Sequence, residues 1–160
     1  MLEIRRAVIE DAASVREVYD AAAGGAALDE SRLERLIRDG GVFVAEEAGA
    51  VVGFGSIEAG AAEHVRWLYV LPARQGGGAG SEILGRLESA GRAAGLESIR
   101  LHASPGAVGF YRRNGYGEAA TGEGVLHDHD GVLMSKELGL VNSVETRRGK
   151  PSGSTRGDAL

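Results

Sequence analysis

The sequence predicts a single α+β domain with α/β/α layering, and three observations lead to this prediction. Stretches in which apolar and polar residues alternate are interleaved with stretches whose apolar residues recur at helical spacing. A length of 160 residues with 43% hydrophobic residues is sufficient for one core. Beyond Val141 the periodicity ends, and Gly, Ser, Arg, Pro and Thr dominate. We therefore expect a domain over residues 1–140 and a disordered tail over residues 141–160.

The first half of the chain is expected to contain four strands and two helices. Glu10 and Asp11 fall in the first turn of the first helix, where the helix dipole favours acidic side chains. Asp29 can cap the second helix, which Gly40-Gly41 ends, and Pro72 stops the fourth strand. In order, the expected elements are a strand at 2–5, helices around 15–22 and 33–37, and strands at 42–46, 51–57 and 64–71, the second and third strands forming a hairpin around 48–50.

The second half is expected to add two helices and three strands. The third helix has an apolar face from Ile83 to Ala94 and ends at Gly95, and Gly115 stands at the C-cap of a short fourth helix over residues 107–114. The remaining strands are expected at residues 98–103, 116–120 and 132–138. The predicted order of elements is therefore β-α-α-β-β-β-α-β-α-β-β.

Composition and charge exclude several classes of protein. The chain has no cysteine, which excludes a disulfide framework, a thiolate metal site and a cysteine nucleophile. The net charge is −5, and the body is more acidic still because the last 20 residues carry four basic and two acidic residues. An acidic body disfavours nucleic-acid binding and favours a cationic small substrate. Neither a secretory signal nor a membrane span is evident, so we expect a cytoplasmic protein, and the Ala-, Gly- and Arg-rich composition suggests a bacterial origin.

The most informative segment is a glycine-rich turn between a strand and a helix. Four glycines fall within Gln75–Gly80, shortly after Pro72 and directly before the third helix. Glycine lets backbone N–H groups approach a ligand, and a helix N-terminus adds unpaired donors with a partial positive charge. The segment is therefore expected to bind a diphosphate. The alternative is a glycine-rich turn that binds no ligand.

Two common phosphate-binding loops do not fit this segment. A P-loop requires Gly-Lys-Ser/Thr after its glycines, whereas the run here ends in Gly80-Ser81-Glu82. A dinucleotide fingerprint requires G-x-G-x-x-G, and neither Gly76-x-Gly78 nor Gly78-x-Gly80 has a glycine three positions further on.

A third motif does fit. Gln75-x-x-Gly78-x-Gly80 resembles the pyrophosphate motif Q/R-x-x-G-x-G/A of the GCN5-related N-acetyltransferase (GNAT) superfamily. Phe110–Tyr116 resembles the F-Y-x-x-x-G-F/Y segment of the same family, and the order of elements over residues 1–138 is similar as well. The resemblance implies a mixed, mostly antiparallel sheet of about seven strands with four helices, splayed between strands 4 and 5. It also implies acetyl-CoA as cosubstrate, bound in the opening.

The resemblance further implies which residues bind acetyl-CoA. Backbone groups of Leu68, Tyr69 and Val70 would hold the acetyl group and the pantetheine arm, with the Val70 N–H as oxyanion donor. Ser104 stands where relatives often carry an asparagine that binds the pantetheine amide. The other residues expected to bind the cosubstrate are Gln75, Gly76, Gly77, Gly78, Ala79, Gly80, Ser81, Phe110 and Tyr111.

Two residues are expected to be catalytic. Tyr111 corresponds to a tyrosine that relatives place beside the CoA sulfur, as a general acid or as a hydrogen-bond donor. His64 corresponds to the general base of some relatives, and Glu63 is the neighbour that could replace it. Strand alternation would place His64 on the same face as Leu68 and Val70.

The implied reaction is direct attack of a primary amine on the acetyl thioester in a ternary complex. The amine, with a pKa near 10.4, is mostly protonated at neutral pH, so a base is needed. The alternative is a non-catalytic acyl-CoA-binding regulatory or interaction module of the same fold. The acceptor amine stays open, no nucleic-acid or membrane partner is expected, and the chain is expected to be a monomer or a homodimer.

His127–Asp130 allows two interpretations. Two histidines at i and i+2 on a strand share a face and could bind a metal with the nearby carboxylates. We favour the alternative, a solvated loop between the last two strands, so that no metal is expected. If this loop has a function, we expect it to border the amine pocket rather than bind a metal.

Overall fold

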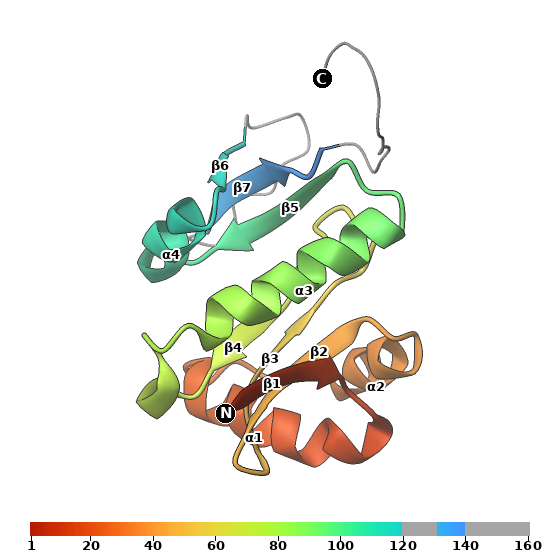
Figure 1. Ribbon diagram of the computed structural model, residues 1–160, viewed down its shortest axis with the longest axis vertical. Helices are drawn as coiled ribbons and strands as arrows, with labels where there is room; N and C mark the ends of the chain where they lie inside the picture. Colours follow the sequence, from red (N-terminus) through yellow and green to blue (C-terminus); the bar gives the residue numbers. More distant parts are fainter. Residues whose placement is uncertain (120–130, 140–160) are drawn as a thin grey trace.

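The computed structural model describes residues 1–119 and 131–139, and it confirms the predicted order of elements (Figure 1). The strands of this part are β1 (Leu2–Arg6), β2 (Val42–Glu47), β3 (Ala50–Ser56), β4 (Leu68–Val70), β5 (Ser98–Ala103), β6 (Gly117–Glu118) and β7 (Val132–Glu137). The α-helices are α1 (Ala12–Ala22), α2 (Glu30–Arg38), α3 (Ala79–Ala93) and α4 (Val108–Arg113). The 3-10 turns are η1 (Ile9–Asp11), η2 (Pro72–Arg74) and η3 (Pro105–Ala107).

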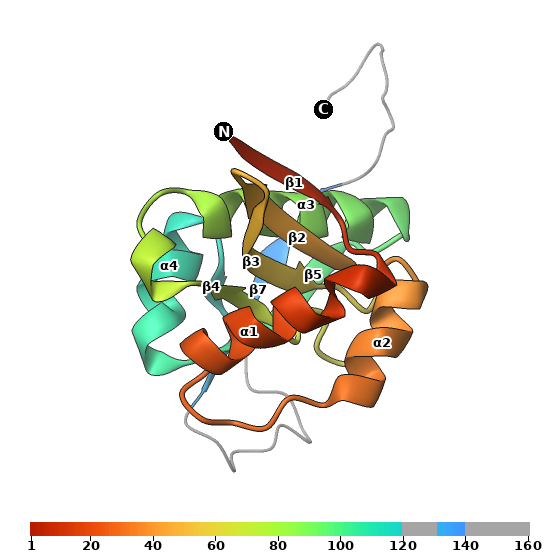
Figure 2. The same cartoon turned by 90° about the horizontal axis from the view of Figure 1, so that it is seen from below.

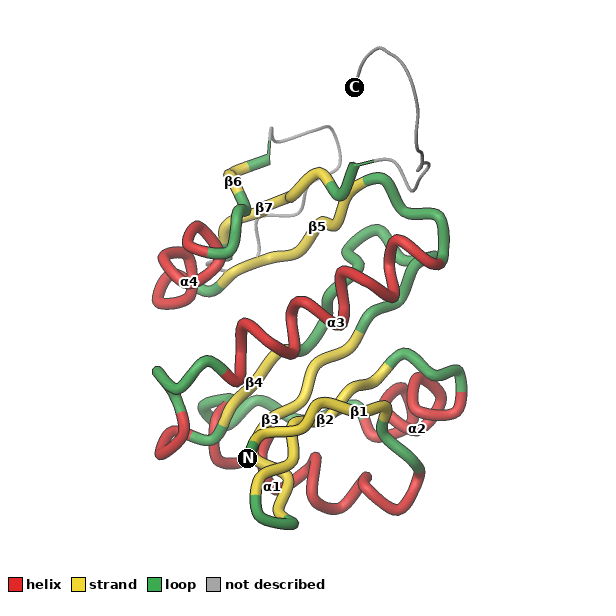
Figure 3. Tube along the Cα trace, in the orientation of Figure 1, coloured by secondary structure: helices red, strands yellow, loops and turns green. Residues whose placement is uncertain are grey.

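The strands form two sheets rather than one continuous sheet (Figure 3). Four pair in the order β1-β2-β3-β4 and three in the order β5-β7-β6, and every one of these ladders is antiparallel. In the described residues one parallel bridge, between Val65 and Leu101, joins the two sheets just before β4. Beyond this bridge β4 and β5 have no ladder between them, which agrees with the predicted splay between strands 4 and 5.

The fourth strand is shorter than the predicted 64–71. The Trp67 N–H is bonded to the Ser56 side chain, at 3.2 Å, and not to a backbone carbonyl of β3. Val65 packs in the core under α3, whereas Trp67 packs in the core under α1 and α2. Residues two apart on a regular strand would share a face, so the alternation breaks between them. The expectation that His64 shares a face with Leu68 and Val70 is therefore wrong.

Helices cover both faces of the four-stranded sheet, as the predicted layering requires. Figure 2 shows α3 on one side of this sheet and α1 and α2 on the other. Each side has its own buried cluster, around Ile83 and Leu87 under α3 and around Val18 and Leu33 under α1 and α2. Helix α3 can approach β3 closely because residue 55 of β3 is a glycine. A Cβ at this position would lie only 2.8 Å from Ile83 and 3.0 Å from Leu87.

A buried polar cluster ties α3 to the three-stranded sheet. Glu88 of α3 is 8% exposed and accepts hydrogen bonds from the Tyr116 hydroxyl at 2.9 Å and from Lys136 Nζ at 3.1 Å. Lys136 of β7 also donates to the Asn114 carbonyl at 3.0 Å. A buried carboxylate without such partners would be costly, so these bonds fix β7 and the exit of α4 relative to α3. The cluster thus holds the C-terminal side of the splay in place.

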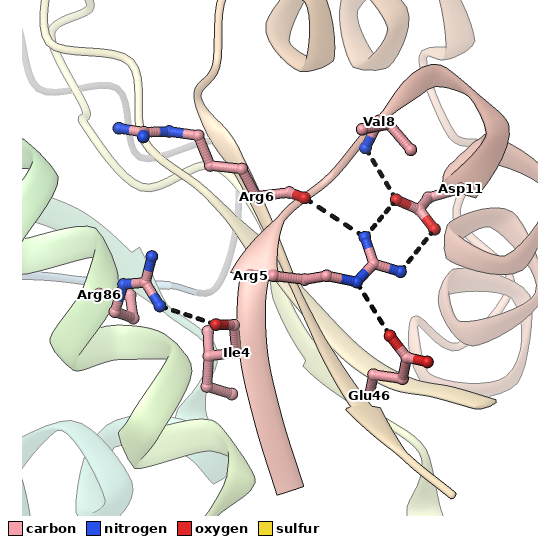
Figure 4. A network of polar contacts seen from close by, with 7 residues as sticks. All are labelled: Ile4, Arg5, Arg6, Val8, Asp11, Glu46 and Arg86. Atoms are coloured by element: carbon pink, nitrogen blue, oxygen red, sulfur yellow. Dashed lines mark hydrogen bonds and ion pairs between the residues drawn. The ribbon is translucent and has the colours of Figure 1, made fainter. Parts of the chain in front are cut away.

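A second polar cluster joins β1, β2 and the turn before α1 (Figure 4). Arg5 binds both carboxylate oxygens of Asp11, at 2.8 and 3.0 Å, and reaches Glu46 at 2.9 Å. Asp11 also accepts from the Val8 N–H at 2.7 Å. The prediction that Glu10 and Asp11 lie in the first turn of α1 is wrong: both belong to η1, because the Asp11 carboxylate closes this turn on Val8 and α1 begins one residue later.

Predictions based on local chemistry hold elsewhere. Asp29 caps α2 by accepting a hydrogen bond from the Arg32 N–H at 3.0 Å. The β2–β3 hairpin turns at Ala48 and Gly49, which both have positive φ (53° and 83°), as a two-residue hairpin turn requires.

Two predictions lie outside the described residues. These are the disordered tail over residues 141–160 and the alternatives for His127–Asp130. Across residues 1–119 and 131–139, every helix falls short of the length and apolar character that crossing a membrane would demand.

Candidate active site

A cavity of about 630 Å³ lies where β4 and β5 diverge. One wall is β4 with the glycine turn, and the other is the segment from Ser104 to α4, so that the loop after β4 and the loop after β5 meet at one edge (Figure 3). Most of the residues predicted to bind acetyl-CoA line it: Leu68, Tyr69, Val70, Gln75, Gly76, Gly78, Gly80, Ser81, Ser104, Phe110 and Tyr111. Gly77 and Ala79 do not line it.

The glycine turn leaves open space at two of its glycines. Gly76 and Gly78 have positive φ (87° and 93°), and a Cβ at either position would meet no protein atom within 4 Å. Gly78 is the N-cap of α3, so the unpaired N–H groups of that helix begin at the cavity wall. Gly80 has another reason to be glycine, because its Cβ would lie 3.2 Å from the ring of Phe110. The turn therefore leaves room for a group that accepts backbone hydrogen bonds.

Strand β4 directs two backbone amides into the same space. The Leu71 N–H donates to Val52 and the Trp67 carbonyl accepts from Ser56, so the odd-numbered residues face β3. Successive residues of an antiparallel strand point their backbone groups in opposite directions, so the amides of Leu68 and Val70 face away from β3. On that side no strand of the described part of the chain pairs with β4. The Val70 carbonyl on that side accepts from Gln75 Nε2 at 3.1 Å. Gln75 thus ties the glycine turn back to β4.

Tyr111 brings a buried hydroxyl to the cavity. Its ring is 7% exposed and packs edge-on against Phe110 and Tyr116, with centroids 5.1 and 5.6 Å away. Burial, and to a lesser extent the nearby Tyr69, raises the pKa of Tyr111 well above its ordinary value of 10.0. The hydroxyl therefore keeps its proton at neutral pH and can donate it in a hydrogen bond. Among the described residues no group is bonded to this hydroxyl.

Two arginines of the cavity wall were not predicted. Arg74 of η2 lies 3.1 Å from Glu47, and Arg113 at the end of α4 forms no ion pair within the described residues. Both stand beside predicted segments, since Arg74 precedes Gln75 and Arg113 belongs to the Phe110–Tyr116 motif. Basic residues that flank a predicted diphosphate loop were the signal that could have identified them.

His64 lies apart from this cavity, and its imidazole is already engaged. Its Nδ1 accepts a hydrogen bond from the Arg100 N–H at 3.0 Å, and the backbone N–H of His64 donates to the Arg100 carbonyl at 2.8 Å. Burial first, and the charge of Arg100 second, lower the pKa of His64 below its ordinary value of 6.5. A neutral imidazole that accepts at Nδ1 carries its proton on Nε2, so it has no second lone pair to take a proton.

A second cavity, of about 560 Å³, lies next to the bridge between the sheets. Its charged lining residues are Arg32 of α2, Glu58 and Glu63 of the β3–β4 connection, Arg66, and His102 of β5. His102 Nδ1 is 2.5 Å from Glu63 Oε2, close enough for the two side chains to form an ion pair. The sequence offered one signal for this residue, the alternation of Arg100 and His102 against the buried Ile99 and Leu101.

The described residues contain no group of three or more His, Asp or Glu placed to hold a metal ion.

Comparisons with known proteins find acetyltransferases. The family profile described as an acetyltransferase (GNAT) domain matches residues 38–118, which contain the glycine turn and Tyr111. No curated protein sequence matches the chain.

Solved structures of the same shape are similar over nearly their full length. The PaiA N-acetyltransferase of Thermoplasma acidophilum, in complex with coenzyme A, has a TM-score of 0.68 and 20% identity, covering 86% of this chain and 99% of that chain. The yncA protein of Salmonella typhimurium, with its cofactor acetyl-CoA, has a TM-score of 0.69 and 24% identity over 92% and 99%. The ribosomal-protein-S18-alanine N-acetyltransferase of Escherichia coli has a TM-score of 0.69 and 17% identity over 93% and 100%. At such identities these structures establish the fold and not the acceptor.

Proposed function

The chain belongs to the GNAT family of acetyltransferases, and from this premise we propose that it is an N-acetyltransferase that moves an acetyl group from acetyl-CoA to a primary amine. The amine attacks the thioester directly while both substrates are bound. The observation that carries the proposal is the cavity between β4 and β5, whose wall combines the glycine turn, the amides of β4 and the hydroxyl of Tyr111. These are the groups that an acyl transfer from a diphosphate-bearing donor requires.

The glycine turn supplies the site for the diphosphate of acetyl-CoA. The open space at Gly76 and Gly78 and the N-terminus of α3 fit an anionic group that accepts hydrogen bonds from backbone N–H. Arg74 and Arg113 add positive charge on either side of this space. Ser81 and Ser104 contribute hydroxyls to the same wall.

The amides of β4 act on the acetyl end. When the amine attacks, negative charge develops on the thioester oxygen, and fixed donors that point to it lower the barrier. The Val70 N–H, which faces away from β3, is the donor that we assign to this oxygen, and the Leu68 N–H lies two residues earlier on the same edge. A backbone donor needs no reorganisation during the reaction, because the β3–β4 ladder already fixes its direction.

Tyr111 acts on the sulfur. A thiol has a pKa near 8.5, whereas burial raises the pKa of Tyr111 above its ordinary value, so full transfer of the phenolic proton to a free thiolate is uphill. A hydrogen bond from the hydroxyl to the sulfur is favourable at every stage and strengthens as charge accumulates on the leaving group. Tyr111 therefore stabilises the leaving thiolate as a hydrogen-bond donor.

The base that takes the proton from the acceptor is assigned to His102, oriented by Glu63. The sequence predicts His64 for this role, but the lone pair of its Nδ1 is bonded to the Arg100 N–H. His102 has a different arrangement, since its Nδ1 faces the carboxylate of Glu63. It stands two residues before Ser104 on the strand that borders the opening.

The test of the proposal is release of free thiol from acetyl-CoA in the presence of a panel of amines, peptides and aminoglycosides, with mass spectrometry of the acceptor. Acetylated amine in amounts equal to the thiol released supports the N-acetyltransferase. Tight binding of acetyl-CoA without thiol release for any acceptor would instead support a regulatory acyl-CoA-binding module. Acetyl transfer only to hydroxyls would also overturn the proposal.

A further inference from the structure

We propose that the second cavity receives the acceptor and that Arg32 and Arg66 bind a carboxylate on it, so that the acceptors of this enzyme are amines that also carry a carboxylate group. This inference rests on the proposed N-acetyltransferase function. It adds the chemical class of the acceptor and the residues that select it.

The position of the second cavity fits an acceptor site. Both cavities are lined by the same two diverging segments, the second by Arg66 and His102 and the first by Leu68 and Ser104. Two residues of extended chain span roughly 7 Å. A small molecule in the second cavity can therefore reach the donors of β4 with one end while its other end stays near α2.

The acidic groups of this cavity are already engaged. Glu58 lies between two guanidinium groups, 3.4 Å from Arg32 and 3.2 Å from Arg35. Glu63 is held by His102 Nδ1. Neither carboxylate is therefore available as the main partner of a further cation, and the selectivity of the cavity depends on its basic groups.

The basic groups keep donors that have no partner within the described residues. Arg32 Nε is buried and makes no hydrogen bond there, although the far end of the same guanidinium reaches Glu58. Arg66 lines the cavity, is exposed, and forms no ion pair in that part of the chain. A buried guanidinium N–H without an acceptor is costly, so an acceptor at this point would stabilise the site.

A carboxylate matches these donors better than other common groups of small amines. Guanidinium groups bind the two oxygens of a carboxylate through paired N–H donors, and such charge-assisted bonds are the strong ones. A hydroxyl or a carboxamide would leave one guanidinium charge without a counter-charge. The ammonium of the same molecule would be deprotonated by His102 in the same cavity.

The experiment compares glycine, β-alanine and γ-aminobutyrate with their own carboxamides as acceptors, in the thiol-release assay. The three acids differ in the length of the chain between amine and carboxylate, so that they sample several distances between the two groups. Rates are expressed per concentration of neutral amine. We expect the best acid to exceed its carboxamide in kcat/KM by roughly 10- to 100-fold, because hydrogen bonds to charged groups contribute about 1.5 to 3 kcal/mol.

Arg66→Gln is the variant that tests the residues. Arg66 is exposed, so the substitution leaves the core unchanged, and we expect the ratio of acid to carboxamide to fall by roughly 10-fold through a higher KM for the acid. Arg38→Gln is the matched control, since Arg38 is exposed on α2, pairs with Glu34 and does not line the cavity. It should leave the ratio unchanged.

The outcomes separate this inference from the proposed function. Equal turnover of acids and carboxamides, or a ratio unaffected by Arg66→Gln, overturns the carboxylate site while the N-acetyltransferase stands. If no amine is acetylated, binding of the acid and of the carboxamide to the CoA-loaded protein is measured instead. The fluorescence of Trp67 follows each titration, because Trp67 is the single tryptophan of the chain and the neighbour of Arg66. A fluorescence change with the acid alone supports the site, and no change with either overturns it.

Discussion

At the scale of single residues, Tyr111 is the clearest case of an environment that limits what a side chain can do. Its ring packs against Phe110 and Tyr116, the residue lines the cavity, and burial raises the pKa of its hydroxyl. A weaker acid is a worse proton donor, yet it remains a hydrogen-bond donor at every pH at which proteins are stable. In the proposed reaction, this packing favours a hydrogen bond to the leaving sulfur over proton delivery.

Tyr111→Phe should therefore lower kcat by about 10²-fold while acetyl-CoA affinity stays nearly the same, because phenylalanine keeps the packing and removes only the hydroxyl. Steady-state rates and a titration of acetyl-CoA binding check this. The fall in kcat should be similar across pH, since the hydroxyl stays protonated throughout. A large loss of affinity with normal turnover would contradict the assigned role.

The two histidines near the opening make opposite predictions. A base takes a proton from the acceptor amine, so its removal lowers the rate. His102→Asn should lower kcat, whereas His64→Asn should leave kcat nearly unchanged, because the Nδ1 of His64 is bonded to Arg100. Steady-state rates of both variants are the measurement. If kcat falls only in His64→Asn, the base is the residue that the sequence predicts.

At the scale of elements, the glycine turn allows two effects of a substitution to be distinguished, backbone strain and obstruction of the binding site. Gly78 has φ of 93° and open space at its Cβ position, at the start of α3. Gly95 has nearly the same φ, 92°, and also open space, but it follows the end of α3. A valine at either position is strained, and only the valine at Gly78 enters the cavity.

Gly78→Val should abolish binding of CoA, and Gly95→Val should retain it, although both variants lose about 1 to 3 kcal/mol of stability through strain. Calorimetric titration with CoA and thermal unfolding of both proteins provide the comparison. Retained binding in Gly78→Val would show that the diphosphate lies elsewhere.

The cluster of Arg5, Asp11 and Glu46 makes a prediction about stability at acid pH. The hydrogen bonds from Arg5 hold the pKa of Asp11 below its ordinary value of 3.8. A carboxyl with a depressed pKa in the folded state stabilises that state above its unfolded pKa, and this contribution is lost as pH falls through the folded pKa.

Asp11→Asn should lower the free energy of unfolding by about 1 to 2 kcal/mol at neutral pH, because two charge-assisted bonds to a partly exposed Arg5 are weakened. The difference from the unsubstituted protein should shrink as pH falls through the folded pKa of Asp11, which lies below its ordinary value of 3.8. Denaturant unfolding at neutral pH and over a series of decreasing acid pH values tests this. Glu10→Gln, in the same turn but exposed, is the control, and an equal effect there would assign the change to net charge.

At the scale of the whole molecule, the sequence predicted features that depend on neighbouring residues. The order of elements, the Asp29 cap and the turn at Ala48-Gly49 each follow from chemistry within a few positions. The cavity wall could also be predicted, because the motifs at Gln75–Gly80 and Phe110–Tyr116 stand beside the strands that position them.

Features that depend on distant residues could not be predicted. Within the described residues one bridge, between Val65 and Leu101, joins the two sheets, and β4 is shortened because the Trp67 N–H donates to the Ser56 hydroxyl. The contact between Glu63 and His102 likewise joins the β3–β4 connection to β5, whereas the alternation of apolar and polar residues describes only one strand at a time. Such contacts are set by how the strands diverge, which periodicity does not encode.

The edge of β4 that faces the opening should be visible in hydrogen exchange. The amides of Leu68 and Val70 are not used by β3, whereas the amide of Leu71 is bonded to Val52. In the free protein the amides of Leu68 and Val70 should exchange faster with deuterium than that of Leu71. Saturating acetyl-CoA should slow both of them, as measured by NMR. Equal protection of all three in the free protein would contradict the assigned direction of the strand.

An unpaired strand edge is in most proteins a hazard, since another chain can add a strand to it and start aggregation. Here the edge is only three residues long and lies in a cavity behind α4 and the glycine turn, with the Val70 carbonyl already covered by Gln75. A strand of another chain would find too few residues to pair with and too little room to enter, whereas a thin, flexible ligand fits the cavity. The splay thus leaves backbone hydrogen-bonding groups that only a narrow molecule can reach.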